Sequence, residues 1–314
     1  MQGEVKEKST GQRKVSLDIL KILMAFLVVA LHGNNFLADV SPLLAYFFRE
    51  GIGRIAVPMF LLINGFYFFE IRTQKQFFNL IKRLLFLYLI WVFLYYLLWH
   101  SPGSGILKIV KQLLVGPLHL WYLIQSLFAF IMLWIIRRLN YKILFSIFII
   151  CTISGICLQY MDIYSLKKIT MTAYRNFLFF CFPFIFIGYS LNKFSFQEKK
   201  MKWNMLFLLS IIILILEVSL NYIFGKGSLD ILVSLYVICP LLFLIALNIN
   251  IYSNKKTLAL YSTGVYLVHW YIFKLPVVNI FNLQGTPRII FVFILSLLLS
   301  WFLIQVKKKF KYIL

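Results

Sequence analysis

The sequence predicts an all-α integral membrane protein in which about ten helices cross the bilayer and both termini lie in the cytoplasm. Hydrophobic residues make up 62% of the 314-residue chain and charged residues only 13%, against about 25% charged residues in a typical soluble domain. The apolar residues come in repeated runs of about 20, the length that crosses about 30 Å of hydrocarbon. The runs lack strand alternation, so helices rather than a barrel are expected to satisfy the backbone in lipid.

Ten apolar runs follow one another with short polar connections between them. Residues 1–14 are polar, and no small-residue cleavage pattern follows the first run, so this run is a first transmembrane helix and not a cleavable signal. We expect one transmembrane domain over residues 17–306, preceded by a cytoplasmic tail of residues 1–16 and followed by a basic cytoplasmic tail of residues 307–314. The ten expected spans are 17–37, 53–70, 81–99, 119–136, 143–160, 175–192, 204–223, 229–247, 258–276 and 287–306.

The basic residues set the expected orientation of these spans. The net charge is +22, which in a soluble protein would suggest nucleic acid. With a cytoplasmic N-terminus, about two thirds of the 32 Lys and Arg residues fall in the cytoplasmic loops and tails, as the positive-inside rule requires. We therefore expect no nucleic-acid partner, both termini inside, and residues 100–118 outside, with a short interfacial helix at 106–115.

The cysteines give no sign of a metal site or a disulfide framework. All four lie in apolar runs, and none shows metal-ligand spacing: Cys151, Cys157, Cys181 and Cys239. We expect them to be reduced packing residues and expect no bound metal.

The first span carries the most informative pair of polar residues, Lys21 and His32. Eleven residues at 100° each make about three full turns, so both side chains face the same way, about 16 Å apart along the axis. A cation near the cytoplasm with an imidazole deeper in the membrane suits an extended ligand such as acyl-coenzyme A, with His32 as a general base. The alternative is that Lys21 snorkels or pairs with Asp18 and that His32 only bonds a neighbouring helix.

The second span contains Pro58, Asn64 and Gly65. Pro58 frees a backbone carbonyl, and Gly65 lets another helix approach closely. Asn64 can donate and accept hydrogen bonds in the interior, so it contacts either a ligand or a neighbouring helix.

Arg83 lies at the cytoplasmic start of the third span, and Trp121 and Tyr122 lie at the outer start of the fourth. By topology alone, Arg83 is a positive-inside residue and the two aromatic residues belong to an ordinary interfacial belt.

Three further ionisable residues lie in the later spans, where such residues are expensive and often functional. Arg175 begins the sixth span on the outer side, against the charge bias. Glu217 lies inside the seventh span, and we expect it to pair with Lys or Arg or to be protonated. His269 lies in the middle of the ninth span, where a lone buried His is more often structural than catalytic.

Taken together, these segments resemble the acyltransferase-3 family of bacterial membrane acyltransferases over about residues 15–305. Lys21 and His32 resemble the family's basic-x10-His motif, with Lys where Arg is more usual. Residues 57–66, VPMFLLINGF, resemble its VPxFFxxSGF segment, with Asn64 where Ser is common. Arg83 and the apolar run after it resemble the basic start of the family's third helix. The remaining similar segments are 119–123 (HLWYL), 175–177 (RNF), 182–189 (FPFIFIGY) and the pieces 261–262 and 266–269 (YS and YLVH).

The resemblance implies a membrane O-acyltransferase that moves a short acyl group, usually acetyl, from acyl-coenzyme A to a hydroxyl of a cell-surface carbohydrate. It implies His32 as the catalytic residue, acyl-coenzyme A as a co-substrate, and a location in the bacterial cytoplasmic (inner) membrane. We expect Lys21, Arg83 and Arg175 to bind the cofactor, although Lys21 lacks the bidentate fork of Arg. For the remaining polar residues we expect substrate or structural roles: Asn64, Trp121, Tyr122, Glu217 and His269.

Two other functions fit polar groups in ten helices. One is a transporter or exporter of a polysaccharide or a small polar molecule, because such groups can line a path. The other is a membrane module that binds or imports an amino acid. The aligned Lys21 and His32 and the absence of inverted halves favour the enzyme over the transporter.

Overall fold

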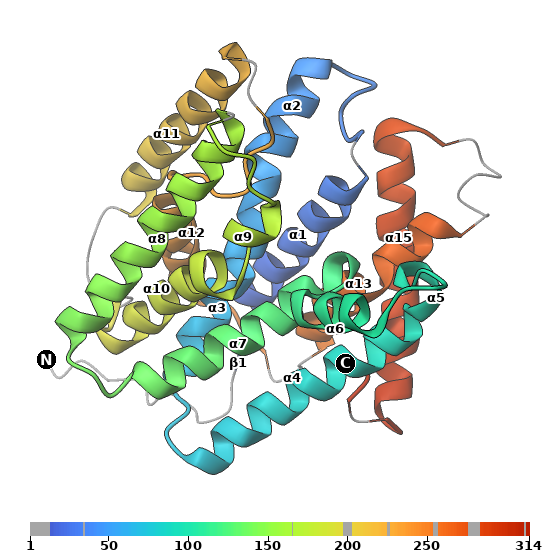
Figure 1. The fold of residues 1–314 in the computed structure, drawn as a ribbon, viewed down its shortest axis with the longest axis horizontal. Helices are drawn as coiled ribbons and strands as arrows, with labels where there is room; N and C mark the ends of the chain where they lie inside the picture. The colour runs from blue at the N-terminus through green and yellow to red at the C-terminus, as the bar shows by residue number, and fades with distance from the viewer. Residues whose placement is uncertain are drawn as a thin grey trace, which may run out of the picture.

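The computed structural model describes residues 13–33, 35–164, 166–196, 203–224, 227–253, 257–275, 283–310 and 312–314. Most of the expected N-terminal tail, residues 1–12, lies outside these ranges. Within them the chain is almost entirely helical (Figure 1). In chain order the longer helices are α1 (Val15–His32), α2 (Pro42–Glu50), α3 (Ala56–Phe68), α4 (Gln74–Leu94), α6 (Ile106–Val115), α7 (Trp121–Ile136), α8 (Tyr141–Ile163), α10 (Phe182–Lys193), α11 (Trp203–Ile223), α12 (Leu235–Asn248), α13 (Thr257–Lys274) and α15 (Gly285–Lys307).

Short elements connect these helices. Two strands of two residues each pair antiparallel and join the start of α1 to the loop before α13. The short elements are β1 (Arg13–Lys14), the 3-10 turns η1 (Ile52–Ile55) and η2 (Leu118–Leu120), the helices α5 (Tyr96–Trp99) and α9 (Met171–Tyr174), the π-helical turn η3 (Phe177–Cys181) and β2 (Tyr252–Ser253).

The chain is a multi-pass membrane protein. Seven helical stretches in the described residues are long and apolar enough to cross a bilayer: Val15–His32, Pro42–Phe68, Gln74–Leu94, Leu118–Ile136, Tyr141–Ile163, Trp203–Ile223 and Gly285–Lys307. Each of the ten expected spans contains a helix, but the count of ten crossings is not confirmed. The helical stretches at 177–193 and 235–248 are shorter, and α13 carries His269 and several hydroxyl side chains along its length.

Two expected boundaries were wrong for physical reasons. The second span was expected to begin at residue 53, but helix α2 already begins at Pro42, where the Ser41 side chain accepts a hydrogen bond from the Leu44 amide. The eighth span was expected to be helical from residue 229, but residues 227–232 are irregular and α12 begins only at Leu235. Side chains of other helices accept hydrogen bonds from the backbone of this irregular segment.

The core of the bundle lies where α3 packs on α10 and where α13 packs on both α1 and α15. Two glycines let the α3 and α10 backbones touch: a Cβ at Gly65 would lie 2.1 Å from the Ile185 carbonyl oxygen, and one at Gly188 would lie 2.0 Å from that of Leu62. The close approach expected at Gly65 is therefore confirmed.

The chain beyond α15 folds back onto the bundle instead of extending away from it. The Tyr312 ring stacks on Phe86 with centroids 5.1 Å apart, and the Trp91 indole donates to the Ile313 carbonyl oxygen at 3.0 Å. Leu314 is 1% exposed. Tyr312 and Leu314 line a cavity of the bundle.

Candidate active site

Three of the four histidines of the chain meet in the interior. His32 ends α1, His119 lies in η2, and His269 lies in α13. The ring centroids of His32 and His269 are 5.0 Å apart, those of His269 and His119 are 4.8 Å apart, and those of His32 and His119 are 6.4 Å apart. His119 and His269 are buried. We call these three residues the histidine cluster.

Backbone hydrogen bonds fix which ring nitrogen of two of these residues carries the proton. The Nδ1 atom of His32 lies 2.8 Å from the Val28 carbonyl oxygen, and that of His269 lies 3.1 Å from the Val265 carbonyl oxygen. A carbonyl oxygen can only accept, so each Nδ1 donates and each Nε2 keeps its lone pair. His32 therefore presents a basic nitrogen to its surroundings.

Aromatic side chains hold the His119 ring in place. Its centroid lies 5.1 Å from that of Tyr95 and 5.2 Å from that of Tyr266, whose hydroxyl donates to the His119 carbonyl oxygen at 2.6 Å. The carbonyl of Leu267 lies beside the ring, but it already accepts the Tyr95 hydroxyl at 2.7 Å. Neither ring nitrogen of His119 makes a hydrogen bond of normal geometry with any described residue.

A large polar cavity of about 830 Å³ lies between α1, α3, α4, α7, α13 and α15. Four cationic side chains line it, and no Asp or Glu side chain does so among the described residues. These cations are Lys21, Lys82, Arg83 and Lys307. Lys21 and Arg83, both expected to bind the cofactor, thus lie on the wall of one cavity.

An aromatic wall separates the same cavity from the histidine cluster. Asn64, Tyr122 and Tyr266 line the cavity, and the Asn64 side chain donates to the Tyr122 hydroxyl at 2.8 Å. The rings of Tyr122 and Tyr266 are 5.5 Å apart, and Tyr266 in turn packs against His119. The cavity therefore ends one aromatic ring away from the histidines.

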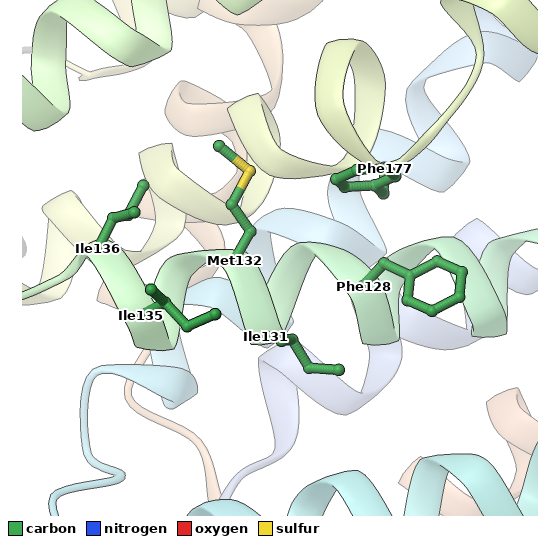
Figure 2. A pocket seen from close by; sticks show the side chains of 6 residues that line it. All are labelled: Phe128, Ile131, Met132, Ile135, Ile136 and Phe177. Carbon is green, nitrogen blue, oxygen red and sulfur yellow. The ribbon is translucent and has the colours of Figure 1, made fainter.

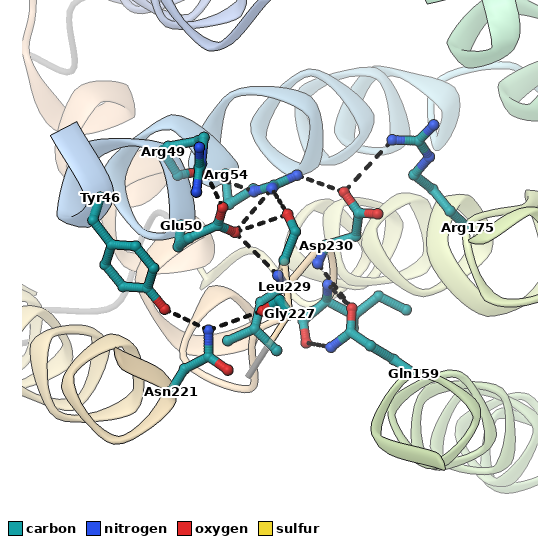
Figure 3. A network of polar contacts seen from close by, with 12 residues as sticks. Tyr46, Arg49, Glu50, Arg54, Gln159, Arg175, Asn221, Gly227, Leu229 and Asp230 are labelled. Atoms are coloured by element: carbon teal, nitrogen blue, oxygen red, sulfur yellow. Dashed lines mark hydrogen bonds and ion pairs between the residues drawn. The ribbon is translucent and has the colours of Figure 1, made fainter. Parts of the chain in front are cut away.

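A second polar centre lies beside the cluster and contains Arg175, which the sequence analysis had grouped with Lys21 and Arg83. Arg175 does not line the large cavity: it lies over the Trp121 ring, 4.8 Å from its centroid, and 3.5 Å from Asp230 Oδ1. Arg54 pairs with the same carboxylate oxygen at 2.5 Å (Figure 3). Both Arg54 and Arg175 interact electrostatically with His32.

Glu50 closes this network from the other side. Its carboxylate is 1% exposed and accepts hydrogen bonds from Arg49 Nε at 2.7 Å and from Arg54 Nη2 at 2.9 Å. It also accepts the amide of Leu229 and the hydroxyl of Ser228, each at 3.0 Å (Figure 3). We call Arg49, Glu50, Arg54, Arg175 and Asp230 the ion-pair network.

Side chains of α8 and α11 satisfy the rest of the irregular segment 227–234. Gln159 accepts the amides of Asp230 and Ile231 at 2.8 and 2.7 Å and donates to the Ile231 carbonyl at 2.8 Å. Glu217 accepts the amides of Val233 and Ser234 at 2.7 and 2.9 Å. Glu217 therefore accepts hydrogen bonds from backbone amides. The sequence had suggested instead that it pairs with Lys or Arg or is protonated.

A second pocket has a wholly apolar lining. It measures about 440 Å³ and lies along the flank of α7 (Figure 2). All of its lining side chains are apolar: Phe128, Ile131, Met132, Ile135, Ile136 and Phe177. In the part of the chain that the structure describes, no group of three or more His, Cys, Asp or Glu side chains could hold a metal ion.

Sequence reasoning missed His119, Trp270 and Arg54 as members of the site. The expected topology held a signal for His119, because it places the start of the fourth span on the outer side, where the end of the first span carries His32. Trp270 follows His269 directly, and its ring centroid lies 5.2 Å from that of His32. No local pattern identifies Arg54, whose partner Asp230 is 176 residues away.

This arrangement offers a basic imidazole between a cation-lined cavity and a paired-charge network. Comparison with known families gives one match: the model of a family described as an acyltransferase domain fits residues 14–305, nearly the whole chain. No curated protein and no solved structure matches the chain.

Proposed function

This chain belongs to the acyltransferase-3 family and is a membrane acyltransferase, and we propose that it moves an acetyl or other short acyl group from acyl-coenzyme A to a hydroxyl of a cell-surface carbohydrate. The observation that carries the proposal is the link between the cation-lined cavity and the histidine cluster. Tyr266 belongs to the cavity wall and also packs on His119.

The cavity suits the donor because its chemistry changes along its length. Phosphate groups favour the cations Lys21, Lys82 and Arg83, with Lys acting as a point charge and Arg as a fork. The amides of a pantetheine arm can bond Asn64 and the tyrosine hydroxyls deeper in the cavity. The volume of about 830 Å³ falls within the range of small-molecule and cofactor sites.

His32 is the proposed general base. Its Nδ1 donates to the Val28 carbonyl, so Nε2 is free to accept the proton of the acceptor hydroxyl. The hydroxyl oxygen then attacks the thioester carbon, the carbon–sulfur bond breaks, and the proton moves from His32 to the departing thiolate. The products are the ester and free coenzyme A, so atoms and charge balance.

The carbohydrate acceptor would approach from the side of the ion-pair network. Trp121 and Arg175 form a partly exposed aromatic and cationic surface there, and the guanidinium groups of Arg54 and Arg175 interact electrostatically with His32. A donor that enters past Lys21 and an acceptor that enters past Arg175 would meet at His32 from opposite ends of α1. This division supports transfer between a cytoplasmic donor and a surface glycan in a bacterial cytoplasmic membrane.

The test is thiol release from acetyl-coenzyme A by the purified protein in nanodiscs, with and without acceptor glycan. We expect His32→Ala to lower turnover by roughly 10²–10⁴-fold, the usual contribution of general acid–base catalysis. His100→Ala is the matched control, because His100 stacks on Tyr96 at a ring distance of 4.6 Å, away from the cluster. Full turnover by a folded His32→Ala variant would remove His32 from the mechanism, and movement of a glycan without thiol release would favour a transporter.

A further inference from the structure

Trp270 carries a buried hydrogen-bond donor that has no acceptor. Its indole Nε1 is inaccessible to solvent and makes no hydrogen bond to any described residue. Trp91 and Trp99 show the ordinary situation, since their indoles donate to the carbonyls of Ile313 and Val92 at 3.0 and 2.9 Å. An indole nitrogen can only donate, so the missing partner must be an acceptor.

An unmet donor of this kind needs an explanation, because burial costs it the hydrogen bond that water would supply. One position that justifies the cost is a place where negative charge appears only during a reaction. Donors held ready for such a charge need no reorganisation at the moment of reaction, and they act in a site from which water is excluded.

The surroundings of Trp270 place it at such a position. Its ring meets that of His32 edge to face, with centroids 5.2 Å apart and planes at 84°. The centroid of the His119 ring lies 6.3 Å from that of Trp270, with the two ring planes at 31°, and His269 is the preceding residue in α13. The indole therefore contacts the proposed base and lies near His119, the ring that packs on the cavity-lining Tyr266.

We propose that the indole N–H of Trp270 donates a hydrogen bond to the carbonyl oxygen of the acyl thioester as that oxygen becomes an oxyanion. This inference rests on the proposed acyl transfer. The nucleophile forms a bond to the carbonyl carbon, the carbonyl π pair moves to the oxygen, and the Trp270 N–H stabilises it. The pair then returns as the carbon–sulfur bond breaks. The same oxyanion forms whether the acceptor hydroxyl or His32 itself attacks.

The decisive variant is Trp270→Phe, which removes the N–H and keeps an aromatic ring. We expect kcat to fall by about 10²-fold or more, as when one oxyanion donor is lost. The KM for acetyl-coenzyme A and the pH dependence of kcat should stay as in the wild type, because donor binding and the base are untouched. Replacing Trp270 by benzothienylalanine, which has sulfur in place of the N–H, should reproduce the loss while preserving the shape of the indole.

A structural role would give a different pattern, and two matched controls reveal it. Trp203 also has a buried, unpartnered indole nitrogen, but it begins α11, far along the chain from the cluster helices. Trp203→Phe should leave kcat unchanged. Trp99→Phe removes a satisfied hydrogen bond and should lower the melting temperature with little change in kcat. Trp270→Phe should do the opposite and lower kcat without lowering the melting temperature.

The outcomes separate this inference from the proposed function. If the wild type releases no thiol from acetyl-coenzyme A, the proposed function fails. If the wild type is active and His32→Ala is not, but both Trp270 variants keep wild-type kcat, then only the assignment of Trp270 is overturned. A loss of kcat that comes with a raised KM and a lowered melting temperature would also overturn it, because packing would then explain the effect.

Discussion

The cation-lined cavity and the ion-pair network both contain several charged side chains, but they differ in whether Asp or Glu side chains lie among the cations. The cavity is lined by Lys21, Lys82, Arg83 and Lys307, and its described lining contains no Asp or Glu side chain. The network pairs its three arginines with the carboxylates of Glu50 and Asp230. Glu50 is 1% exposed, whereas Lys82 and Arg83 are exposed.

This difference separates structural charge from charge available to a ligand. Buried ions must be paired and hydrogen-bonded, because removing one partner leaves an uncompensated charge. Lys82 and Arg83 are exposed and line the cavity, so they can attract an anion from outside the chain. We therefore expect that removing a charge from the ion-pair network destabilises the fold. Removing a charge from the cavity wall should weaken ligand binding instead.

The largest effect should follow from breaking the network at its centre with Arg54→Met. Glu50 and Asp230 would lose their shared guanidinium, so we expect the free energy of unfolding to fall by about 3–5 kcal/mol. Thermal unfolding in detergent measures this change, with Arg83→Met as the matched control that should leave stability unchanged. Equal losses in both variants would contradict the distinction between the two regions.

Reversing a charge in the cavity should change binding and leave stability alone. For Arg83→Glu we expect the KM for acetyl-coenzyme A to rise about fivefold, which corresponds to the ~1 kcal/mol upper value for an exposed ion pair. Lys21→Glu should act in the same direction, Lys21→Met less strongly, and Lys21→Arg should retain most activity, because Arg also binds phosphate. Steady-state kinetics in nanodiscs provides the measurement, and an unchanged KM in both Glu variants would place the donor elsewhere.

The smallest effect is expected at an exposed carboxylate outside both regions. Asp39 accepts hydrogen bonds from the hydroxyl and amide of Thr286 at 2.7 and 3.1 Å, which ties the loop after α1 to the start of α15. The Thr286 hydroxyl holds the pKa of Asp39 below its ordinary value of 3.8. A lowered pKa stabilises the fold at pH values above 3.8, and this contribution fades as the pH falls through the lowered value.

Asp39→Asn should therefore lower the melting temperature slightly at pH 7, by about 1 °C, and have no effect at a pH below the lowered pKa. Melting curves of both proteins across this range check the prediction. If the two proteins still differed in melting temperature in acid, the stabilisation by Asp39 would come from hydrogen-bond geometry and not from its charge.

The sequence by itself determined the features that depend on local spacing. Apolar runs of membrane length predicted helices in all ten places, and helical periodicity placed Lys21 and His32 on one face of α1. In the structure Lys21 lines the cavity and His32 lies in the histidine cluster. Gly65 predicted close helix packing, because a residue without a side chain lets another backbone approach closely.

Only the tertiary structure decided which distant polar groups meet. Residues 229–234 are apolar enough to predict a span. In the structure, however, the side chains of Glu50, Gln159 and Glu217 accept hydrogen bonds from the backbone amides of this segment, so these amides are satisfied without a helix. Arg175 and Arg83 look alike in the sequence, but one faces Asp230 and the other lines the cavity. A hydrogen bond or an ion pair depends on ångström distances between side chains of different helices, and the spacing of residues along one helix does not contain that information.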